Sequence, residues 1–372
     1  MGNATVPMGK YTKIKTGKLD ANASSPNGIY PFFTCSRDPL KISSYSYDCE
    51  CVLVAGNGDL NVKYYTGKFD AYQRTYIIES SDKHKLDTRY LYCFLDKYVE
   101  KLREQSIGGV IKYIKLGHLT EAPIPLPPLE VQRRIADVLD RASALIEKRK
   151  AQIDKLDLLI KAQFVEMFGD PVTNPKRWKY STLENIADIA SSKRIFESEY
   201  VSEGVPFFRT KEIVELSKGK SISTELFITE ERYNEIKTKY EVPQIGNMLV
   251  SAVGTIGVIW VVDTNEPFYF KDGNLLWIRC RVNSNSIFMK YLLTALIDYY
   301  KKDLVAGSSY NALTIIKLKQ MKTHNPPLQL QTQFATFVQS VEVQKTHLQQ
   351  SLVKLEQSYQ SLMQKCFRGD IF

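Results

Sequence analysis

Two stretches of this sequence are copies of each other, and this repeat constrains the fold more than any other feature. Pro127, Pro128 and Leu129 open the first copy, and the same three residues recur 199 positions later. Further identical pairs at this offset are Gln132 and Gln331, Ala136 and Ala335, Lys155 and Lys354, Leu156 and Leu355, and Phe168 and Phe367. Each proline pair precedes about 40 residues free of Gly and Pro, which predicts a helix of roughly 60 Å.

Apolar residues in both copies follow an alternating spacing of three and four, which is typical of helices that supercoil against a partner. The seam residues are Leu139, Ile146, Ile153, Leu156 and Ile160 in the first copy, and Val338, Val341, Leu348, Leu352, Leu355 and Tyr359 in the second. The simplest partner for one helix is the other. The competing interpretation is two unrelated helical hairpins within a larger helical core.

The two long segments that alternate with these helices are predicted to be similar α+β domains. We place a first domain at 1–122, a helical connector at 123–170, a second domain at 171–325 and a second connector at 326–372. Short aromatic or β-branched runs separated by Gly, Asn and Asp predict strands in both domains. Helices are expected near 89–103 and 286–303.

Positive charge is concentrated in these two domains. The chain carries a net charge of +9, and residues 1–122 and 171–325 each carry about +4, so a polyanion would bind there. Arg, Lys, Asn and Gln can contact base edges or phosphates. The candidate DNA-binding residues are Lys18, Asn22, Arg37, Asn57, Lys63, Tyr64, Gln73, Arg74, Lys193, Arg194, Arg209, Lys211, Lys271, Asn274, Tyr310 and Asn311.

Catalytic and metal-binding patterns are missing from the sequence. It has no GxxxxGK[ST] phosphate loop, and its six cysteines and four histidines are dispersed without a CxxC pair, so we predict no catalytic, cofactor-binding or metal-binding residues. Asn325-Pro-Pro-Leu328 is similar to a motif of adenine methyltransferases, but Leu328 lacks the aromatic face that stacks on a base, so we interpret it as a helix start.

Membrane and secretion signals are also missing. The longest apolar run, 248–262, is about 15 residues, shorter than a membrane-spanning helix requires, and we interpret it as a buried strand. The N-terminus shows no secretory signal, so we expect a cytoplasmic protein.

The sequence resembles the specificity (S) subunits of type I restriction-modification systems. The resemblance rests on the connector from Pro123 to Pro171, its degenerate second copy, and Tyr180-Ser-Thr-Leu-Glu-Asn-Ile-Ala-Asp-Ile189. Phe32-Phe-Thr-Cys-Ser36 and Val54-Ala-Gly-Asn-Gly-Asp-Leu-Asn61 are similar to stretches of target-recognition domains. It implies two target-recognition domains separated by two antiparallel helices, with a pseudo-twofold repeat.

The resemblance also implies partners. Each recognition domain would read half of a split site in double-stranded DNA, and the helices would set the distance between halves. Two methyltransferase subunits carrying S-adenosylmethionine would dock on the helices, and two restriction subunits would carry ATP- and Mg-dependent translocation and cleavage. Thr323-His324-Asn325 departs from the usual lead-in to the helix. The alternative function is a non-catalytic protein-interaction scaffold with two modules on a coiled-coil rod.

Overall fold

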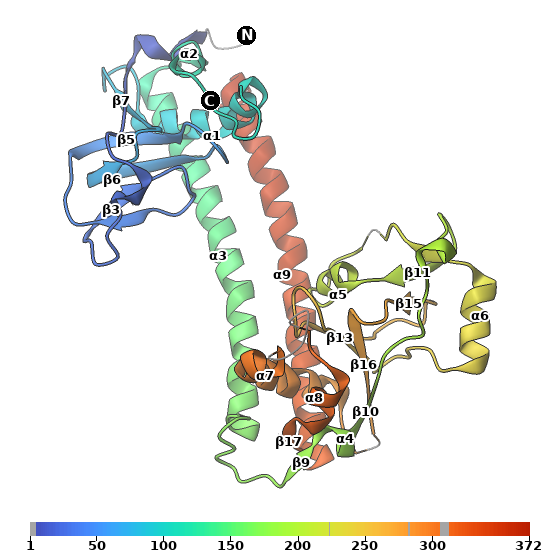
Figure 1. Cartoon of the computed structure of the whole chain (residues 1–372). Helices are drawn as coiled ribbons and strands as arrows, with labels where there is room; N and C mark the ends of the chain where they lie inside the picture. Colours follow the sequence, from blue (N-terminus) through green and yellow to red (C-terminus); the bar gives the residue numbers. More distant parts are fainter. Residues whose placement is uncertain (1–4, 223, 282, 306–311) are drawn as a thin grey trace. The chain divides into compact units, whose positions relative to one another are not determined.

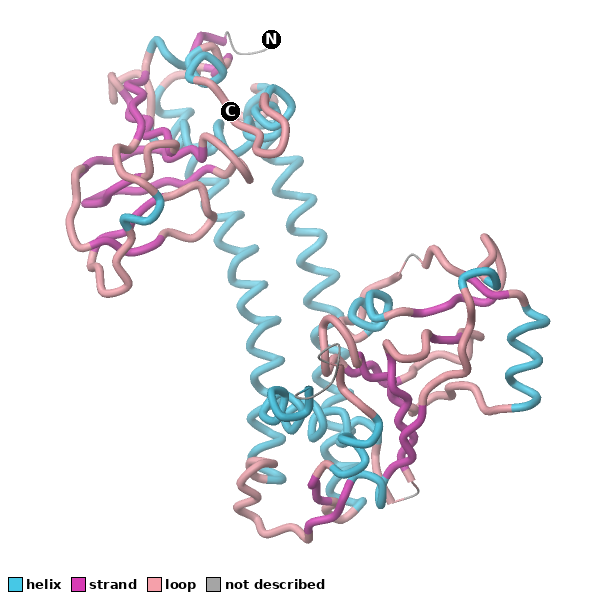
Figure 2. The backbone as a smooth tube through the Cα atoms, in the orientation of Figure 1, coloured by secondary structure: helices cyan, strands magenta, loops and turns pink. Residues whose placement is uncertain are grey.

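The chain forms two compact units, each mixing helices and strands (Figure 2). The structure, a computed structural model, describes residues 5–222, 224–281, 283–305 and 312–372. Unit 1 comprises Met1–Ala151 with Gln349–Phe372, and unit 2 comprises Gln152–Leu348. The long helices α3 (Leu129–Phe168) and α9 (Leu328–Arg368) each contribute to both units.

Unit 1 is built on a six-stranded sheet in the order β2-β7-β5-β6-β3-β4, of which Figure 1 labels β7, β5, β6 and β3. Its elements are β1 (Thr5–Pro7), η1 (Met8–Lys10), β2 (Thr12–Thr16), η2 (Ala21–Ala23), β3 (Tyr30–Phe33), β4 (Leu40–Ile42), β5 (Tyr47–Ala55), β6 (Val62–Ala71), β7 (Thr75–Ser80), α1 (Thr88–Gln105), α2 (Leu116–Thr120) and β8 (Pro123–Pro125). The helix expected near 89–103 is confirmed as α1. Its apolar face packs on the sheet, with Tyr90, Leu91 and Leu95 fully buried.

Unit 2 repeats this plan with a divided sheet. Its elements are β9 (Tyr180–Thr182), α4 (Leu183–Ile186), β10 (Ala187–Ala190), η3 (Glu197–Glu199), β11 (Val205–Phe208), α5 (Thr210–Leu216), β12 (Phe227–Ile228), α6 (Glu230–Lys239), β13 (Met248–Ser251), β14 (Ile259–Val261), β15 (Tyr269–Phe270), β16 (Leu275–Cys280), α7 (Ser286–Val305), α8 (Ile315–Gln320) and β17 (Lys322–His324). The helix expected near 286–303 is confirmed as α7.

Strand order shows that the two sheets are equivalent. The order β10-β16-β13-β14 in one sheet and β15-β11-β12 in the other matches β2-β7-β5-β6-β3-β4 of unit 1. The long strand β6 corresponds to β14 and β15 together, because residues 262–268, which include Pro267, interrupt the ladder there. The two units are therefore similar α+β folds, as the sequence repeat predicts, while the predicted domain bounds of 1–122 and 171–325 stay a prediction.

The expectation of one buried strand over 248–262 is wrong. The segment is a hairpin in which β13 pairs antiparallel with β14, and the chain reverses between them. Gly254 has a φ of +74°, a left-handed conformation that glycine adopts without strain. Continuous apolar composition hid this turn because both strands are buried.

The long helices run antiparallel where they pack together in each unit. In unit 1, Ile135 and Leu139 of α3 share a core with Met363 and Phe367 of α9. In unit 2, Ile160, Phe164 and Phe168 of α3 share a core with Phe334, Val338 and Val341 of α9. Lys150 and Glu356 form an ion pair of 3.7 Å in unit 1, and Lys345 and Asp157 form one of 2.5 Å in unit 2.

The structure places every seam residue at a buried or half-buried position. Leu139, Ile146, Ile160, Val338 and Val341 are buried, with at most 8% of the side chain exposed. The remaining seam residues, Ile153, Leu156, Leu348, Leu352, Leu355 and Tyr359, are half-buried.

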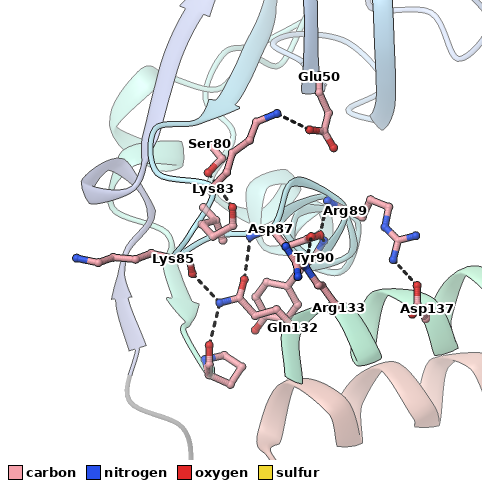
Figure 3. Close-up of polar contacts among 12 residues, drawn as sticks. Glu50, Ser80, Lys83, Lys85, Asp87, Arg89, Tyr90, Gln132, Arg133 and Asp137 are labelled. Carbon is pink, nitrogen blue, oxygen red and sulfur yellow. Dashed lines mark hydrogen bonds and ion pairs between the residues drawn. The ribbon is translucent and has the colours of Figure 1, made fainter. Parts of the chain in front are cut away.

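A buried glutamine near the start of each long helix forms hydrogen bonds that hold the start of another helix, the one that packs on the sheet of the same unit. In unit 1, Gln132 accepts a hydrogen bond from the backbone N–H of Asp87 (3.0 Å) and donates to the carbonyls of Lys85 and Pro127 (Figure 3). Asp87 in turn caps α1 by accepting from two backbone N–H groups of its first turn. The glutamine therefore connects the start of α3 to the start of α1.

Gln331 makes the same connection in unit 2. It accepts from the backbone N–H of Asn285 (2.8 Å) and donates to Asn325 Oδ1 and the carbonyl of Pro326, both at 2.7 Å. Asn285 caps α7 as Asp87 caps α1. Both glutamines have no exposed surface. The repeat seen in the sequence is thus a repeat of hydrogen bonds.

Candidate nucleic-acid interface

In unit 1, several loops meet at one end of the sheet. The loop after β3 contacts the loop before β7, because the backbone N–H of Tyr72 donates to the carbonyl of Phe33 (2.9 Å). The loop after β5 joins them through a hydrogen bond of 2.8 Å from Gly56 N to Arg74 O. A fourth segment, 106–115, is held there by a hydrogen bond from Ile114 N to Gly56 O (2.9 Å).

The same three hydrogen bonds recur in unit 2. Lys271 N donates to Phe208 O (2.9 Å), Ala252 N donates to Asn274 O (2.8 Å), and Leu313 N donates to Ala252 O (2.9 Å). Strand order assigns these residues to the same places in the sheet as their counterparts in unit 1. Each unit therefore presents a set of loops at the corresponding end of its sheet, which we call the loop end.

The loop end of unit 1 gathers most of the candidate residues from that domain. Gln73 and Arg74 lie directly before β7, Asn57 lies in the loop after β5, and Arg37 lies in the loop after β3. Lys63, near the start of β6, donates to Asn61, which in turn donates to the carbonyl of Cys35 in the loop after β3. Gln73 donates to Asp20 (2.7 Å), which places the loop carrying Lys18 and Asn22 beside it.

Two charged groups in this loop end have shifted pKa values. Partial burial lowers the pKa of the Lys63 ammonium, which donates to Asn61. The hydrogen bond from Arg37 (3.0 Å) lowers the pKa of the Asp59 carboxyl. Because Arg37 is mostly exposed and paired with Asp59, its guanidinium is oriented at the surface of the loop end.

In unit 2 the candidate arginines are held by carboxylates. Arg194 pairs with Asp272 (2.9 Å), and Arg209 pairs with the fully buried Glu212 (3.0 Å), which raises the pKa of Arg209 through that hydrogen bond. Lys193 lies over the ring of Tyr240 at 4.2 Å.

The lining of a pocket of about 600 Å³ at the loop end of unit 2 contains three lysines and one glutamate. Lys211 and Asn274 line it together with Lys218, Lys220 and Thr255. Lys211 and Asn274 are candidates from the sequence, whereas the other three are not.

Sequence reasoning also missed residues of unit 1. A pocket of about 460 Å³ at this loop end is lined by Gln73 and Arg74, and also by Tyr113 and Lys115 from the segment before the connector. The pair Gly108-Gly109 is a turn signal that could have identified this segment.

Three candidates lie away from the loop ends or outside the described part of the chain. Tyr64 is the third residue of β6, donates to Glu50 (2.9 Å) and contacts Tyr92 of α1. Tyr310 and Asn311 lie outside the described residues. Among the described residues, none of the helices has the length and hydrophobicity of a membrane-spanning segment.

Comparison with known families shows which family the chain belongs to. Residues 8–156 and 175–357 match the type I restriction modification DNA specificity domain. The chain belongs to this family. The predicted resemblance to type I specificity subunits is therefore confirmed, and the two matched regions place one specificity domain in each half of the chain. DNA sequence specificity is the function that the family description names, and specificity subunits are non-catalytic parts of their complexes.

Individual relatives agree with the family. The specificity subunit of the type I restriction enzyme EcoDI from Escherichia coli is 40% identical over 177 residues, which cover 47% of this chain and 39% of that subunit. The putative specificity subunit S.HindORF215P of Haemophilus influenzae is 26% identical over 345 residues, covering 89% of this chain and 85% of the relative.

Solved structures of type I systems share the fold. The S subunit of M. genitalium superposes with a TM-score of 0.60 at 17% identity, covering 98% of this chain and 96% of that one. A chain from a structure on complex assembly and conformational transition of the type I R-M system has a TM-score of 0.57 at 18% identity, covering 100% of this chain and 98% of that one. The predicted fold class is thus confirmed.

Proposed function

We propose that this specificity-family chain reads a bipartite DNA sequence, with one half-site recognised by the loop end of each unit. The observation that supports this proposal is the repetition of the loop end itself. The same three backbone hydrogen bonds hold equivalent loops in both units, yet the side chains on those loops differ, as with Arg74 and Asn274. Loops of the same geometry that carry different side chains are what we expect of two domains that recognise different half-sites.

The direct test is methylome sequencing of a host with and without this gene. We expect methyladenine in a motif of two defined halves separated by a fixed spacer, present only with the gene. A methylome that is the same in both strains while the partner methyltransferase is expressed contradicts the proposal, and the scaffold function would then be favoured.

We also propose that α3 and α9 set the spacer length. Each helix continues without interruption from one unit into the other. Seven residues inserted after Ile153 of α3 and after Gln350 of α9 preserve the heptad seam and lengthen each helix by about 10 Å. The spacer should increase by about 3 base pairs, at roughly 3.4 Å each, while both half-sites stay the same. An unchanged spacer in the methylome of the variant would exclude this role.

For partner binding, we propose that methyltransferase subunits dock on the long helices and do so unequally. In unit 2, α3 exposes an apolar strip in which Leu158 is 62% exposed and Val165 is 52% exposed. The equivalent positions of α9 are Gln357 and Gln364. The double variant Leu158→Ser/Val165→Ser should weaken co-purification of one methyltransferase subunit, whereas Gln357→Ser/Gln364→Ser should not. Equal effects would contradict unequal docking.

We also propose that the partner subunits, and not this chain, bind the cofactors of the system. We propose that S-adenosylmethionine binds the methyltransferase subunits and that ATP and Mg bind the restriction subunits. The support is the sequence, which contains no phosphate loop and no cofactor-binding motif.

A further inference from the structure

A short hairpin turn in unit 1 presents two bare apolar side chains beside the candidate base-reading residues. Ile107 and Tyr113 exchange both backbone hydrogen bonds, at 3.0 and 2.9 Å, and close a turn whose tip carries Val110 and Ile111. The side chain of Val110 is fully exposed, and that of Ile111 is 63% exposed. We call residues 107–113 the apolar turn.

The apolar turn is fastened to the sheet. Gly58 N donates to the carbonyl of Lys112 (2.9 Å), and the next residue after the turn, Ile114, is buried and donates to Gly56 O. Gly108 has a φ of +112°, and an added Cβ would lie 2.6 Å from the carbonyl oxygen of Ile111, so the turn requires glycine there. The tip is held in place, and its exposure is therefore a property of an ordered turn.

Basic side chains lie on the apolar turn and beside it: Lys112 belongs to the turn, Arg74 lines a pocket with Ile111, and Lys115 lines one with Tyr113. Within the described residues, no ion pair involves Arg74, Lys112 or Lys115. Exposed Val and Ile side chains beside basic side chains that form no ion pair suit a polyanion with apolar groups between its phosphates. Duplex DNA has this chemistry, because thymine methyl groups line its major groove.

The neighbours of the turn indicate which groove it enters. Ile111 lines a pocket of about 320 Å³ together with Asn57, Tyr72, Arg74 and Tyr113. Arg pairs with guanine and Asn with adenine through edges that only the major groove presents in full. We propose that Val110 and Ile111 enter the major groove of the half-site read by unit 1 and contact thymine methyl groups there. This inference rests on the proposed function.

The test uses the full chain with its methyltransferase partner and the duplex motif found in the wild-type methylome. In Val110→Ser/Ile111→Ser, affinity for this duplex relative to a duplex with a scrambled first half-site should fall about tenfold, a loss typical of one base contact. The slope of log affinity against log salt should stay at the wild-type value, because every basic side chain that neutralises a phosphate remains. Lys112→Ala/Lys115→Ala should reduce that slope by about one unit for each phosphate that is no longer neutralised, and should keep the affinity ratio.

Replacing each thymine of the first half-site with uracil tests the methyl contact directly. At one position or more, this replacement should weaken binding of the wild-type chain and leave binding of Val110→Ser/Ile111→Ser unaffected. The matched control is Ile29→Ser, because Ile29 is an 80% exposed apolar residue at the opposite end of β3. This variant should change neither the affinity ratio nor the effect of uracil on binding.

Two results overturn the inference. One is a Val110→Ser/Ile111→Ser variant whose affinity ratio between the cognate and the scrambled duplex equals that of the wild type. The other is a wild-type chain whose affinity does not change when any thymine of the first half-site is replaced with uracil. If the proposed function itself is wrong, the result is distinguishable, because the wild-type chain would then bind the scrambled and the cognate duplex equally.

Discussion

Replacing Gln331 with leucine should destabilise unit 2 by an amount that follows from its three hydrogen bonds. The side chain has no exposed surface, and its removal leaves the N–H of Asn285 and the carbonyl of Pro326 without this partner. At about 1 kcal/mol for each hydrogen bond, the free energy of unfolding should fall by about 3 kcal/mol. With a urea dependence of about 3 kcal/mol per M for a unit of this size, the midpoint should fall by about 1 M.

Tryptophan fluorescence isolates this effect. The chain has three tryptophans, Trp178, Trp260 and Trp277, and all belong to unit 2, so their emission reports unfolding of that unit alone. Gln333→Leu is the matched control, because Gln333 is exposed on the same turn of α9 and its replacement should shift the midpoint little. A shift below about 0.3 M in Gln331→Leu would refute the view that this glutamine holds α7 to α9.

Three further perturbations test other parts of the structure. Burial lowers the pKa of His324 below its usual 6.5, so the unfolded chain binds the proton more readily. The free energy of unfolding of unit 2 should therefore fall as the pH drops below about 6.5, and His324→Leu should reduce this dependence in urea titrations at several pH values. Ile160→Asp, at a buried seam position, should lower the free energy of unfolding by about 3 kcal/mol or more, as measured by urea unfolding. Leu158→Asp, at an exposed position, should lower it by only about 0.5 kcal/mol. Lys218→Ala/Lys220→Ala should weaken DNA binding and reduce its salt slope by about one unit for each phosphate left without a lysine.

Each of these has a result that contradicts it. An identical pH profile in His324→Leu would mean that the histidine is not what destabilises unit 2 in acid. Equal destabilisation by Ile160→Asp and Leu158→Asp would refute the assigned packing of α3 against α9. A wild-type salt slope in Lys218→Ala/Lys220→Ala would remove the lysine-lined pocket from the interface.

The long helices and the repeat could be predicted because their signals are local and periodic. The proline pairs, the glycine-free runs and the seam spacing all lie within one continuous segment, and the helices begin at Leu129 and Leu328 as those signals indicate. The Asn325-Pro-Pro-Leu328 sequence is confirmed as a helix start, and Asn325 accepts a hydrogen bond from Gln331.

The loop ends were less predictable because they depend on contacts between distant segments. Arg74 and Ile114 meet Gly56 only because strand pairing brings three separate loops together. Lys218 and Lys220 lie on a surface segment after α5 that has no periodicity, so composition alone could not join them to Asn274. The hairpin of β13 and β14 was missed for the opposite reason, since two buried strands have the same apolar composition as one.

The most direct measurement for this account is the methylome of a host that carries Lys211→Ala/Asn274→Ala in place of the wild-type gene. Both side chains line the loop-end pocket of unit 2. If each unit reads its own half-site, one half of the methylated motif should become relaxed or altered while the other half and the spacer stay the same. A motif unchanged in both halves, or altered in both, would contradict the account.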